Sequence, residues 1–323
     1  MARLAEAGIG SAEFTDLTEP FRRELLAHCY RMLGSVDEAE DLVQETYLRA
    51  WRYYRGFEGR SSVRTWLYQI ATNACLSALA RGARRPLPSG LGPPGEEPLS
   101  APAENGWLQP IPDQLVIAES SDPAAVAVAR ESLRLALIAA LQNLPARQRA
   151  VLILREVLSF PAADVATMLG TTTAAVKSAL QRARVRLDLA SPRPDQIAEP
   201  VDPIARALLD RYIAAFENAD AEGLRRVLSD DISLELPPSS TWYAAAGAAA
   251  CAVAGLESAG NWRMVPTGAN GQPAAATYHR DPDGSYQAYG VVVLTVTSTA
   301  IARITVFADA GLLARFGLPA QLH

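Results

Sequence analysis

A segment near the middle of the chain gathers polar and cationic side chains on one side. At helical spacing it carries Lys177, Ser178, Gln181, Arg182 and Arg184. Side chains of these types donate hydrogen bonds to base edges in a major groove and clamp the flanking phosphates. We therefore expect this face to bind duplex DNA. The alternative is an ordinary solvated helix in a three-helix bundle.

A second charged set lies near the N-terminus and is acidic. Asp37, Asp41, Gln44 and Glu45 share one face of a predicted helix, and only two arginines follow them. Like charges this close repel each other. A cationic protein partner would relieve the repulsion, and a merely solvated face is the alternative.

The next predicted helix interleaves basic, aromatic and amide side chains on its polar face. These are Arg64, Tyr68, Gln69, Thr72, Asn73 and Ser77, and arginines follow at its end. Such a face suits single-stranded DNA, because bases stack on rings while guanidinium groups track phosphates. Tyr68 could equally be a half-buried amphipathic side chain.

Hydrophobic spacing predicts the helices that would position these groups. Ser35, with Glu38 three residues later, is a capping box for a helix up to about residue 50, and another helix starts at Val63. Three more are expected over 146–158, 162–169 and 174–187. Gly170 at the turn and a threonine cap before the last helix give helix-turn-helix spacing.

Composition fits a globular protein that does not cross a membrane. The chain has 323 residues, 49% hydrophobic and 20% charged, which predicts two or three domains. It has no run of roughly 18 apolar residues and no apolar N-terminal signal, so we expect a cytoplasmic protein. The net charge of −5 hides a basic segment, residues 126–187, with 9 basic and 3 acidic residues. Three distant cysteines favour neither disulfides nor zinc, and we expect no metal and no cofactor.

Changes in composition divide the chain into folded pieces and linkers. Residues 86–125 are rich in Pro, Gly, Ser and Glu, which is typical of a flexible linker. Its apolar stretch 107–113 is expected to dock on something. The folded pieces are then 10–85, 126–190 and 203–320.

The last piece has an α+β pattern. Helices are expected over 204–216, around 224–228 and over 244–256, with strands over 232–236, 262–267, 274–278, 286–297 and 301–307. An enzyme would need a carboxylate base and an oxyanion donor in one dry pocket. Candidates exist, but no spacing singles out a pair: Asp231, Glu235, Tyr243, Tyr278 and His279.

The two helical pieces resemble a known family. Ala39–Arg49 (AEDLVQETYLR) and Arg64–Asn73 (RTWLYQIATN) are similar to region two of bacterial extracytoplasmic-function (ECF) sigma factors. Leu144–Arg149, Asp164–Ala166 and Val176–Arg184 resemble region four. The resemblance covers about residues 14–190. It implies two all-α domains, a region-two bundle and a region-four helix-turn-helix.

The resemblance also implies partners and sites. Core RNA polymerase would be bound through its β′ coiled coil and β flap, with the coiled coil on Asp41, Gln44 and Glu45. The promoter minus-ten element would be held by Phe57, Arg60, Ser61, Ser62, Trp66, Gln69 and Asn73. The minus-thirty-five element would be read by Thr173, Lys177, Ser178, Gln181, Arg182 and Arg184. Departures from the family pattern at Ser77, Ala80 and Asp164 affect the expected minus-ten sequence rather than the function.

The C-terminal piece resembles SnoaL-like, NTF2-like cones. Trp242-Tyr243, residues 269–274 and residues 316–319 look like those of the version fused to sigma factors. Such cones often enclose a pocket, so a small ligand is a candidate partner. We expect a sigma factor, not an enzyme, whose promoter recognition and transcription initiation are modulated by the fused cone. The alternatives are a SnoaL-like isomerase or hydrolase with a DNA-binding appendage, and a one-component repressor that binds duplex DNA without polymerase.

Overall fold

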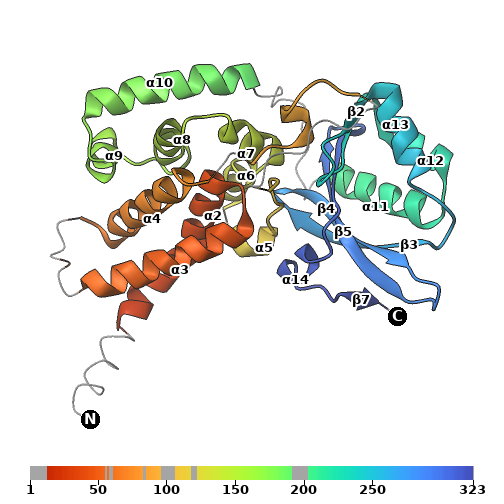
Figure 1. The fold of residues 1–323 in the computed structure, drawn as a ribbon, viewed down its shortest axis with the longest axis horizontal. Coiled ribbons are helices and arrows are strands. Elements are labelled where there is room, and N and C mark those ends of the chain that lie inside the picture. The colour runs from red at the N-terminus through yellow and green to blue at the C-terminus, as the bar shows by residue number, and fades with distance from the viewer. Residues whose placement is uncertain are drawn as a thin grey trace, which may run out of the picture. The chain divides into compact units, whose positions relative to one another are not determined.

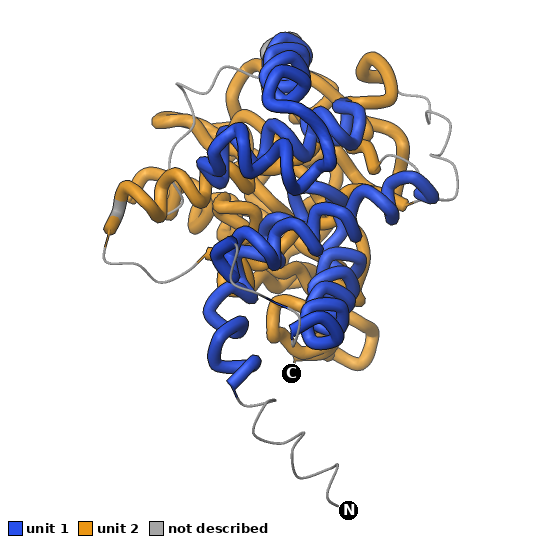
Figure 2. Tube along the Cα trace, turned by 90° about the vertical axis from the view of Figure 1, so that its left-hand side faces the viewer, with its two compact units in different colours: residues 1–84, 140–191 blue, residues 85–139, 192–323 orange. Residues whose placement is uncertain are grey.

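The computed structural model describes residues 13–54, 57, 61–82, 85–95, 106–117, 122–190 and 203–322. The chain forms two compact units, residues 1–84 with 140–191 and residues 85–139 with 192–323 (Figure 2). The N-terminal helices thus share a unit with the helix-turn-helix, and the expected linker shares a unit with the C-terminal piece. Within the described ranges, no helix is both long and apolar enough to cross a bilayer.

The first unit begins with four helical segments, and the second of them is buried on all sides over residues 25–33. They are η1 (Glu19–Phe21), α2 (Arg22–Leu33), α3 (Val36–Tyr53) and α4 (Val63–Leu79). As predicted, Ser35 caps α3, because its hydroxyl accepts a hydrogen bond from the Glu38 amide at 3.3 Å. Ala39, Val43 and Ala50 form the buried stripe of α3.

The predicted helix-turn-helix is confirmed in the same unit. Its helices are α8 (Ala146–Leu152), α9 (Ala162–Met168) and α10 (Thr173–Ala190) (Figure 1). A π-helical turn, η4 (Ile153–Val157), extends α8. Gly170 follows α9 with a φ of +59°, a left-handed conformation in which glycine carries no steric penalty. The Thr172 hydroxyl accepts from the Ala175 amide at 3.2 Å, so the threonine cap is also confirmed.

The second unit is built on one mixed sheet. Its strands are β1 (Leu228–Glu235), β2 (Trp242–Ala244), β3 (Trp262–Ala269), β4 (Gln272–Arg280), β5 (Tyr286–Val296), β6 (Ile301–Phe307) and β7 (Gln321–Leu322). The order is β2-β1-β6-β5-β4-β3, and β7 pairs with β5. Helices α11 (Pro203–Glu217), α12 (Ala221–Val227), α13 (Ala245–Ala254) and α14 (Leu312–Arg315) accompany it. Helix α11 packs on β3, β4 and β5 (Figure 1). Helix α13 packs on β1. We call residues 203–322 the cone.

The sheet is mixed because one pair of neighbouring strands is parallel. Strand β1 lies parallel to β6, with Leu234 opposite Ile304, while the other pairs are antiparallel. Parallel neighbours need a long crossover. Here α13 and the four strands β2 to β5 intervene between β1 and β6, so local turn signals could not reveal the pairing.

The linker region contributes ordered elements and buried side chains to the second unit. These elements are η3 (Pro88–Gly90), α5 (Asp113–Val116), α6 (Pro123–Glu131) and the first part of α7 (Leu135–Gln142). Leu87, Leu108 and Ile111 are buried. The docking expected for residues 107–113 is therefore confirmed. The boundaries expected for the individual domains stay predictions.

Candidate nucleic-acid interface and the linker contacts

The acidic residues of α3 lie on its solvent side. Asp41 and Gln44 are exposed, and Glu45 is half-buried. Glu45 forms an ion pair with Arg49 one turn later, with 2.7 Å between Oε1 and Nε. This i,i+4 pair relieves part of the repulsion expected from the sequence. Asp41 and Gln44 remain available on the same face for a partner.

An aromatic pair marks the start of α4. The rings of Phe57 and Trp66 stack with centroids 4.7 Å apart. Ser62 caps the helix, because its hydroxyl accepts from the Thr65 amide at 3.0 Å. Ser61 is exposed and Gln69 is half-buried. The structure thus brings most of the expected minus-ten residues to one end of α4, and Arg60 lies outside the described residues.

The expected exposed aromatic surface of α4 is wrong at Tyr68. This side chain is fully buried, and its hydroxyl donates to Glu24 at 3.0 Å. Burial raises the pKa of Tyr68, and the adjacent Glu24 carboxylate adds to the rise. Thr72 is also buried and bonds His28 at 2.9 Å. Helix α2 covers Tyr68 and Thr72, so these two side chains support the fold.

Region-four residues meet the polar side of α4. The Arg64 guanidinium lies 4.6 Å from the centre of the Phe160 ring, which also contacts Tyr68 edge-on. The Asn73 side-chain amide donates to the Met168 carbonyl on α9 at 3.4 Å. One of the expected minus-ten residues is therefore engaged by region four in the free chain.

A buried arginine ties the two helical regions together. Arg149 on α8 donates to the Gln142 side chain at 2.6 Å, to the Gln142 carbonyl, to the Leu144 carbonyl and to the Met32 carbonyl on α2. Only 3% of this residue is exposed. The sequence analysis quoted Arg149 as part of a motif but assigned it no role. Arg149 lies in an amphipathic helix of the basic segment, and nothing in the sequence distinguishes it from the other basic residues there.

The outward face of α10 is confirmed as a polar and cationic surface. All six expected minus-thirty-five residues are exposed: Thr173, Lys177, Ser178, Gln181, Arg182 and Arg184. Arg182 donates to Ser178 at 2.6 Å, and Arg184 pairs with Glu156 at 2.7 Å. These contacts hold two guanidinium groups in place above the helix. The face is therefore open to a partner on the side where the sequence predicts contact with DNA.

In the second unit, the linker is fastened to the turn between β3 and β4. Asn270 in this turn is fully buried with a φ of +57°. Its side chain accepts from the Ile111 amide at 3.0 Å and donates to the Leu133 carbonyl at 2.8 Å. Asp113 accepts from the Gly271 amide at 2.7 Å. Burial raises the pKa of Asp113 to about 6, against the opposing effect of this hydrogen bond.

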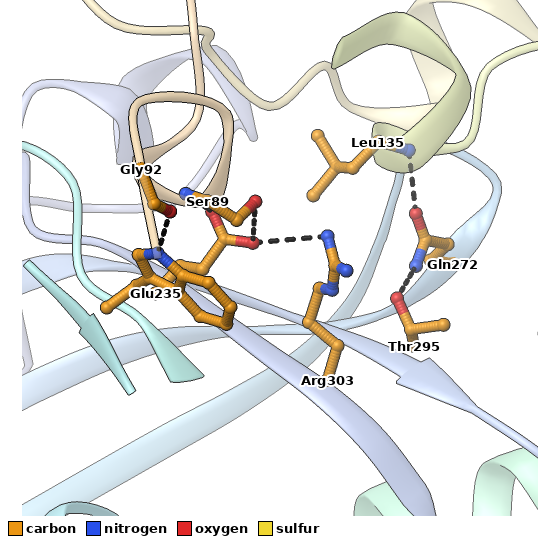
Figure 3. Close-up of polar contacts among 8 residues, drawn as sticks. Ser89, Gly92, Leu135, Glu235, Gln272, Thr295 and Arg303 are labelled. Carbon is orange, nitrogen blue, oxygen red and sulfur yellow. Dashed lines mark hydrogen bonds and ion pairs between the residues drawn. The ribbon is translucent and has the colours of Figure 1, made fainter. Parts of the chain in front are cut away.

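Two further contacts hold the linker on the sheet (Figure 3). The Leu135 amide donates to the buried Gln272 side chain at 2.9 Å, and that side chain donates onward to Thr295. Glu235, fully buried, accepts from the Ser89 hydroxyl at 3.0 Å and pairs with Arg303 at 3.1 Å. Removing a partner from a buried carboxylate leaves its charge uncompensated, which is strongly destabilising.

Trp242 adds an anchor on the neighbouring strand. Its indole N–H donates to the Gly92 carbonyl at 2.9 Å. The chain thus contacts the cone at three separate places: near Ser89–Gly92 and Ile111–Asp113 within the linker, and near Leu133–Leu135 after it. This long-range attachment was not visible in the composition of the segment.

The five residues considered for an enzyme do not meet in one pocket. Glu235 faces the linker, and the Tyr278 hydroxyl donates to the Pro319 carbonyl at 3.0 Å. His279 bonds the exposed Glu257, and Asp231 is exposed. Neither these four nor Tyr243 lines the cavity enclosed by the cone. These five residues therefore do not place a general base and an oxyanion donor together in one pocket.

Comparison with known proteins matches both helical regions. The sigma-70 region 2 family matches residues 17–85, and the sigma-70 region 4 family matches residues 134–187. The ECF RNA polymerase sigma factor SigG of Mycobacterium tuberculosis is 47% identical over 317 residues, covering 96% of this chain and 85% of the relative. SigJ of the same organism is 29% identical over 220 residues, covering 67% of this chain and 62% of SigJ.

The fold is also shared with a solved structure. The crystal structure of the M. tuberculosis ECF sigma factor SigJ superposes with a TM-score of 0.59 at 23% identity, covering 96% of this chain and 99% of that chain. The predicted fold class, two helical regions followed by an α+β NTF2-like cone, is confirmed. The match to SigG extends through the cone as well as both helical regions. The chain therefore belongs to the ECF RNA polymerase sigma factors.

Proposed function

We propose that this sigma factor directs core RNA polymerase to its promoters through two surfaces of opposite charge. Asp41, Gln44 and Glu45 on α3 would contact the β′ coiled coil, and region four would contact the β flap. The exposed acidic face of α3 supports the first contact. The residues around the Phe57–Trp66 stack would capture an unpaired minus-ten base, and the exposed face of α10 would read the minus-thirty-five element.

The minus-ten surface is partly covered in the free chain. Asn73 contacts Met168, and Arg64 lies over Phe160. Region four must move off α4 before Asn73 can contact DNA. We therefore infer that binding to polymerase separates the two regions, which would limit promoter binding by the sigma factor alone.

The cone is proposed to regulate the sigma factor rather than to catalyse a reaction. The observation that carries this proposal is the burial of linker residues against the sheet, with Asn270 bonded to both Ile111 and Leu133. The linker sets how far apart the two promoter-binding regions can lie. A cone that holds the linker restrains that spacing, and a cone that releases it permits both regions to engage the promoter.

Reconstitution with core polymerase and mapping of transcript starts would test the promoter assignment. Lys177→Ala and Gln181→Ala are each expected to lower promoter-specific output about tenfold, because a lost base-edge contact is worth roughly 1–3 kcal/mol. Both variants should still bind core polymerase. Asp41→Lys should instead weaken core binding. Arg206→Ala, which removes an exposed cation from α11 of the cone, is the charge-matched control.

Two results would refute the assignment. One is wild-type protein that gives no discrete transcript starts with core polymerase. The other is an equal loss of output in Lys177→Ala and Arg206→Ala, because the effect would then come from overall charge. Duplex binding that is tight without polymerase would favour the one-component repressor.

A further inference from the structure

A cleft of about 470 Å³ lies between the linker and the cone, within the second unit. The residues that line it come from both parts: Arg85, Trp107 and Gln109 on the linker side, and Pro238, Phe307 and Asp309 on the cone side. Small-molecule sites in proteins usually measure roughly 300–1,000 Å³. The cleft is therefore large enough for a small molecule that touches the linker and the cone at once.

The cleft is separate from the cavity inside the cone. On β6, Val306 lines that inner cavity, and the next residue, Phe307, lines the cleft. Leu236 and Pro237, which follow β1, divide in the same way. Successive side chains of a strand point to opposite faces. The sheet therefore lies between the two spaces, and the cleft is on the face where the linker docks.

An aromatic ring would find apolar surface on both walls of the cleft. Trp107 is half-buried and Phe307 is buried, while Pro238 is exposed at the opening. Among the described residues, Trp107 makes no hydrogen bond and no ring–ring contact. Aromatic rings pack favourably on one another in stacked or edge-to-face arrangements. The cleft thus offers a tryptophan ring on which a planar group can pack.

Arg85, which directly precedes the linker, places a cation in the linker wall. It is half-buried, and its guanidinium lies against Gly106, which also lines the cleft. A Cβ atom at Gly106 would lie 2.8 Å from Arg85 Nη1, so glycine leaves room for the guanidinium here. Arg85 has other contacts within the chain, but a guanidinium carries five N–H donors. It can therefore also hold a ligand carboxylate, which its forked geometry fits.

Asp309 places an anion in the cone wall. It is exposed, and its carboxylate accepts from the Gly311 amide at 2.9 Å. Among the described residues, no ion pair joins Asp309 to Arg85 or to another cation. The two walls therefore carry one charge of each sign. A ligand with a single charge would leave one of these groups unmatched.

We propose that this cleft binds a small aromatic zwitterion, of the class of the aromatic amino acids, and that the bound molecule holds the linker on the cone. Its carboxylate would pair with Arg85, its ammonium group with Asp309, and its ring would pack on Trp107 and Phe307. A molecule that binds only when both walls are in place stabilises the docked linker by the same factor. An effect on transcription rests on the regulatory role proposed for the cone, whereas binding does not.

Calorimetric titration of the full-length chain with L-phenylalanine would test the proposal. We expect saturable binding. The analogue 2-phenylethylamine lacks the carboxylate and should bind at least about tenfold more weakly, as expected for the loss of a hydrogen bond between charged groups. The analogue 3-phenylpropanoate lacks the ammonium group and should bind about threefold more weakly, because an ion pair with an exposed carboxylate contributes less.

Two variants and one control locate the site. Asp309→Asn keeps an oxygen that can accept from the Gly311 amide, but it should bind L-phenylalanine about threefold more weakly and 3-phenylpropanoate like the wild type. Ala310→Trp adds a bulky side chain at an exposed lining residue and should abolish binding while circular dichroism confirms folding. Asp281→Asn is the matched control, because this exposed carboxylate of the cone does not line the cleft, and it should bind like the wild type.

Hydrogen exchange would test whether the ligand holds the linker. The Leu108 amide, which donates to the Pro86 carbonyl at 3.3 Å, should exchange several times more slowly with saturating L-phenylalanine. Four results would overturn the proposal: no saturable binding, unchanged binding in Ala310→Trp, equal affinities for Asp309→Asn and Asp281→Asn, or binding without slower exchange at Leu108. Because these assays contain no polymerase, their failure is distinct from a failure of promoter recognition.

Discussion

Replacing Asn270 by glycine should release the linker from the cone. Asn270 is buried in the β3–β4 turn with a φ of +57°, which glycine adopts without strain. The substitution therefore keeps the turn but removes the side chain that bonds Ile111 and Leu133. It isolates the contribution of these two hydrogen bonds. Asn270→Ala would add roughly 1–2 kcal/mol of strain for the left-handed backbone.

The size of the effect follows from the groups left without partners. The Ile111 amide loses its acceptor, and the Leu133 carbonyl loses a donor. An unsatisfied buried polar group costs about 1–3 kcal/mol. With two such groups, we therefore expect the linker to be held about 2–6 kcal/mol less tightly. Since 1.4 kcal/mol is a factor of ten, amide protection in the linker should fall at least roughly 30-fold and at most roughly 20,000-fold.

Hydrogen exchange would measure this change. The Leu115 and Ile117 amides are suitable probes, because their own acceptors, the Pro112 and Asp113 carbonyls, are untouched by the substitution. Asn218→Ala is the control, since among the described residues this exposed side chain bonds only the Ala214 carbonyl of α11. If both amides keep wild-type protection in Asn270→Gly, the linker is not held by this turn and the reasoning fails.

Three other predictions concern buried polar groups. Because the folded-state pKa of Asp113 is raised to about 6, stability should fall by about 2 kcal/mol as pH rises from 4 to 6; Asp113→Asn should flatten this trend in thermal melts. Burial lowers the pKa of His28 to about 3, so stability should instead fall by about 2 kcal/mol as pH drops from 7 to 5; unchanged acid sensitivity in His28→Gln would contradict this. Arg149→Met should lower the free energy of unfolding of the first unit by about 3 kcal/mol in urea titrations, because its carbonyl acceptors lose their donor; a loss below 1 kcal/mol would count against it.

The helical regions were largely predictable because their signals are local. The capping box at Ser35, the threonine cap at Thr172 and the left-handed Gly170 each act within a few residues. The face of α10 could be predicted for the same reason. Tyr68 could not, because a polar face predicted from helical spacing does not reveal that α2 and Phe160 cover it.

The linker shows where composition misleads. A Pro- and Gly-rich segment has a low average hydrophobicity, but a few apolar residues such as Leu108 and Ile111 suffice to anchor it. Their partners in the β3–β4 turn lie more than a hundred residues away. The two buried amides that bind the linker, Asn270 and Gln272, look in the sequence like ordinary turn residues. The structure was needed to bring them together.

The anchoring of the linker on the cone also changes how the role of the cone is best tested. Deleting residues beyond about 200 would remove the cone side chains that bind the linker, including Glu235 and Asn270. Loss of activity in such a truncated protein could then reflect misfolding. A point substitution that frees the linker while the cone stays folded separates regulation from stability.

Promoter-specific transcription by core polymerase with the wild type, Asn270→Gly and Asn218→Ala is the most direct measurement. If the cone restrains the promoter-binding regions through the linker, Asn270→Gly should give several times more transcript from the same start site, and Asn218→Ala should match the wild type. Equal output from all three proteins, with linker protection lost in Asn270→Gly, would contradict the proposed control.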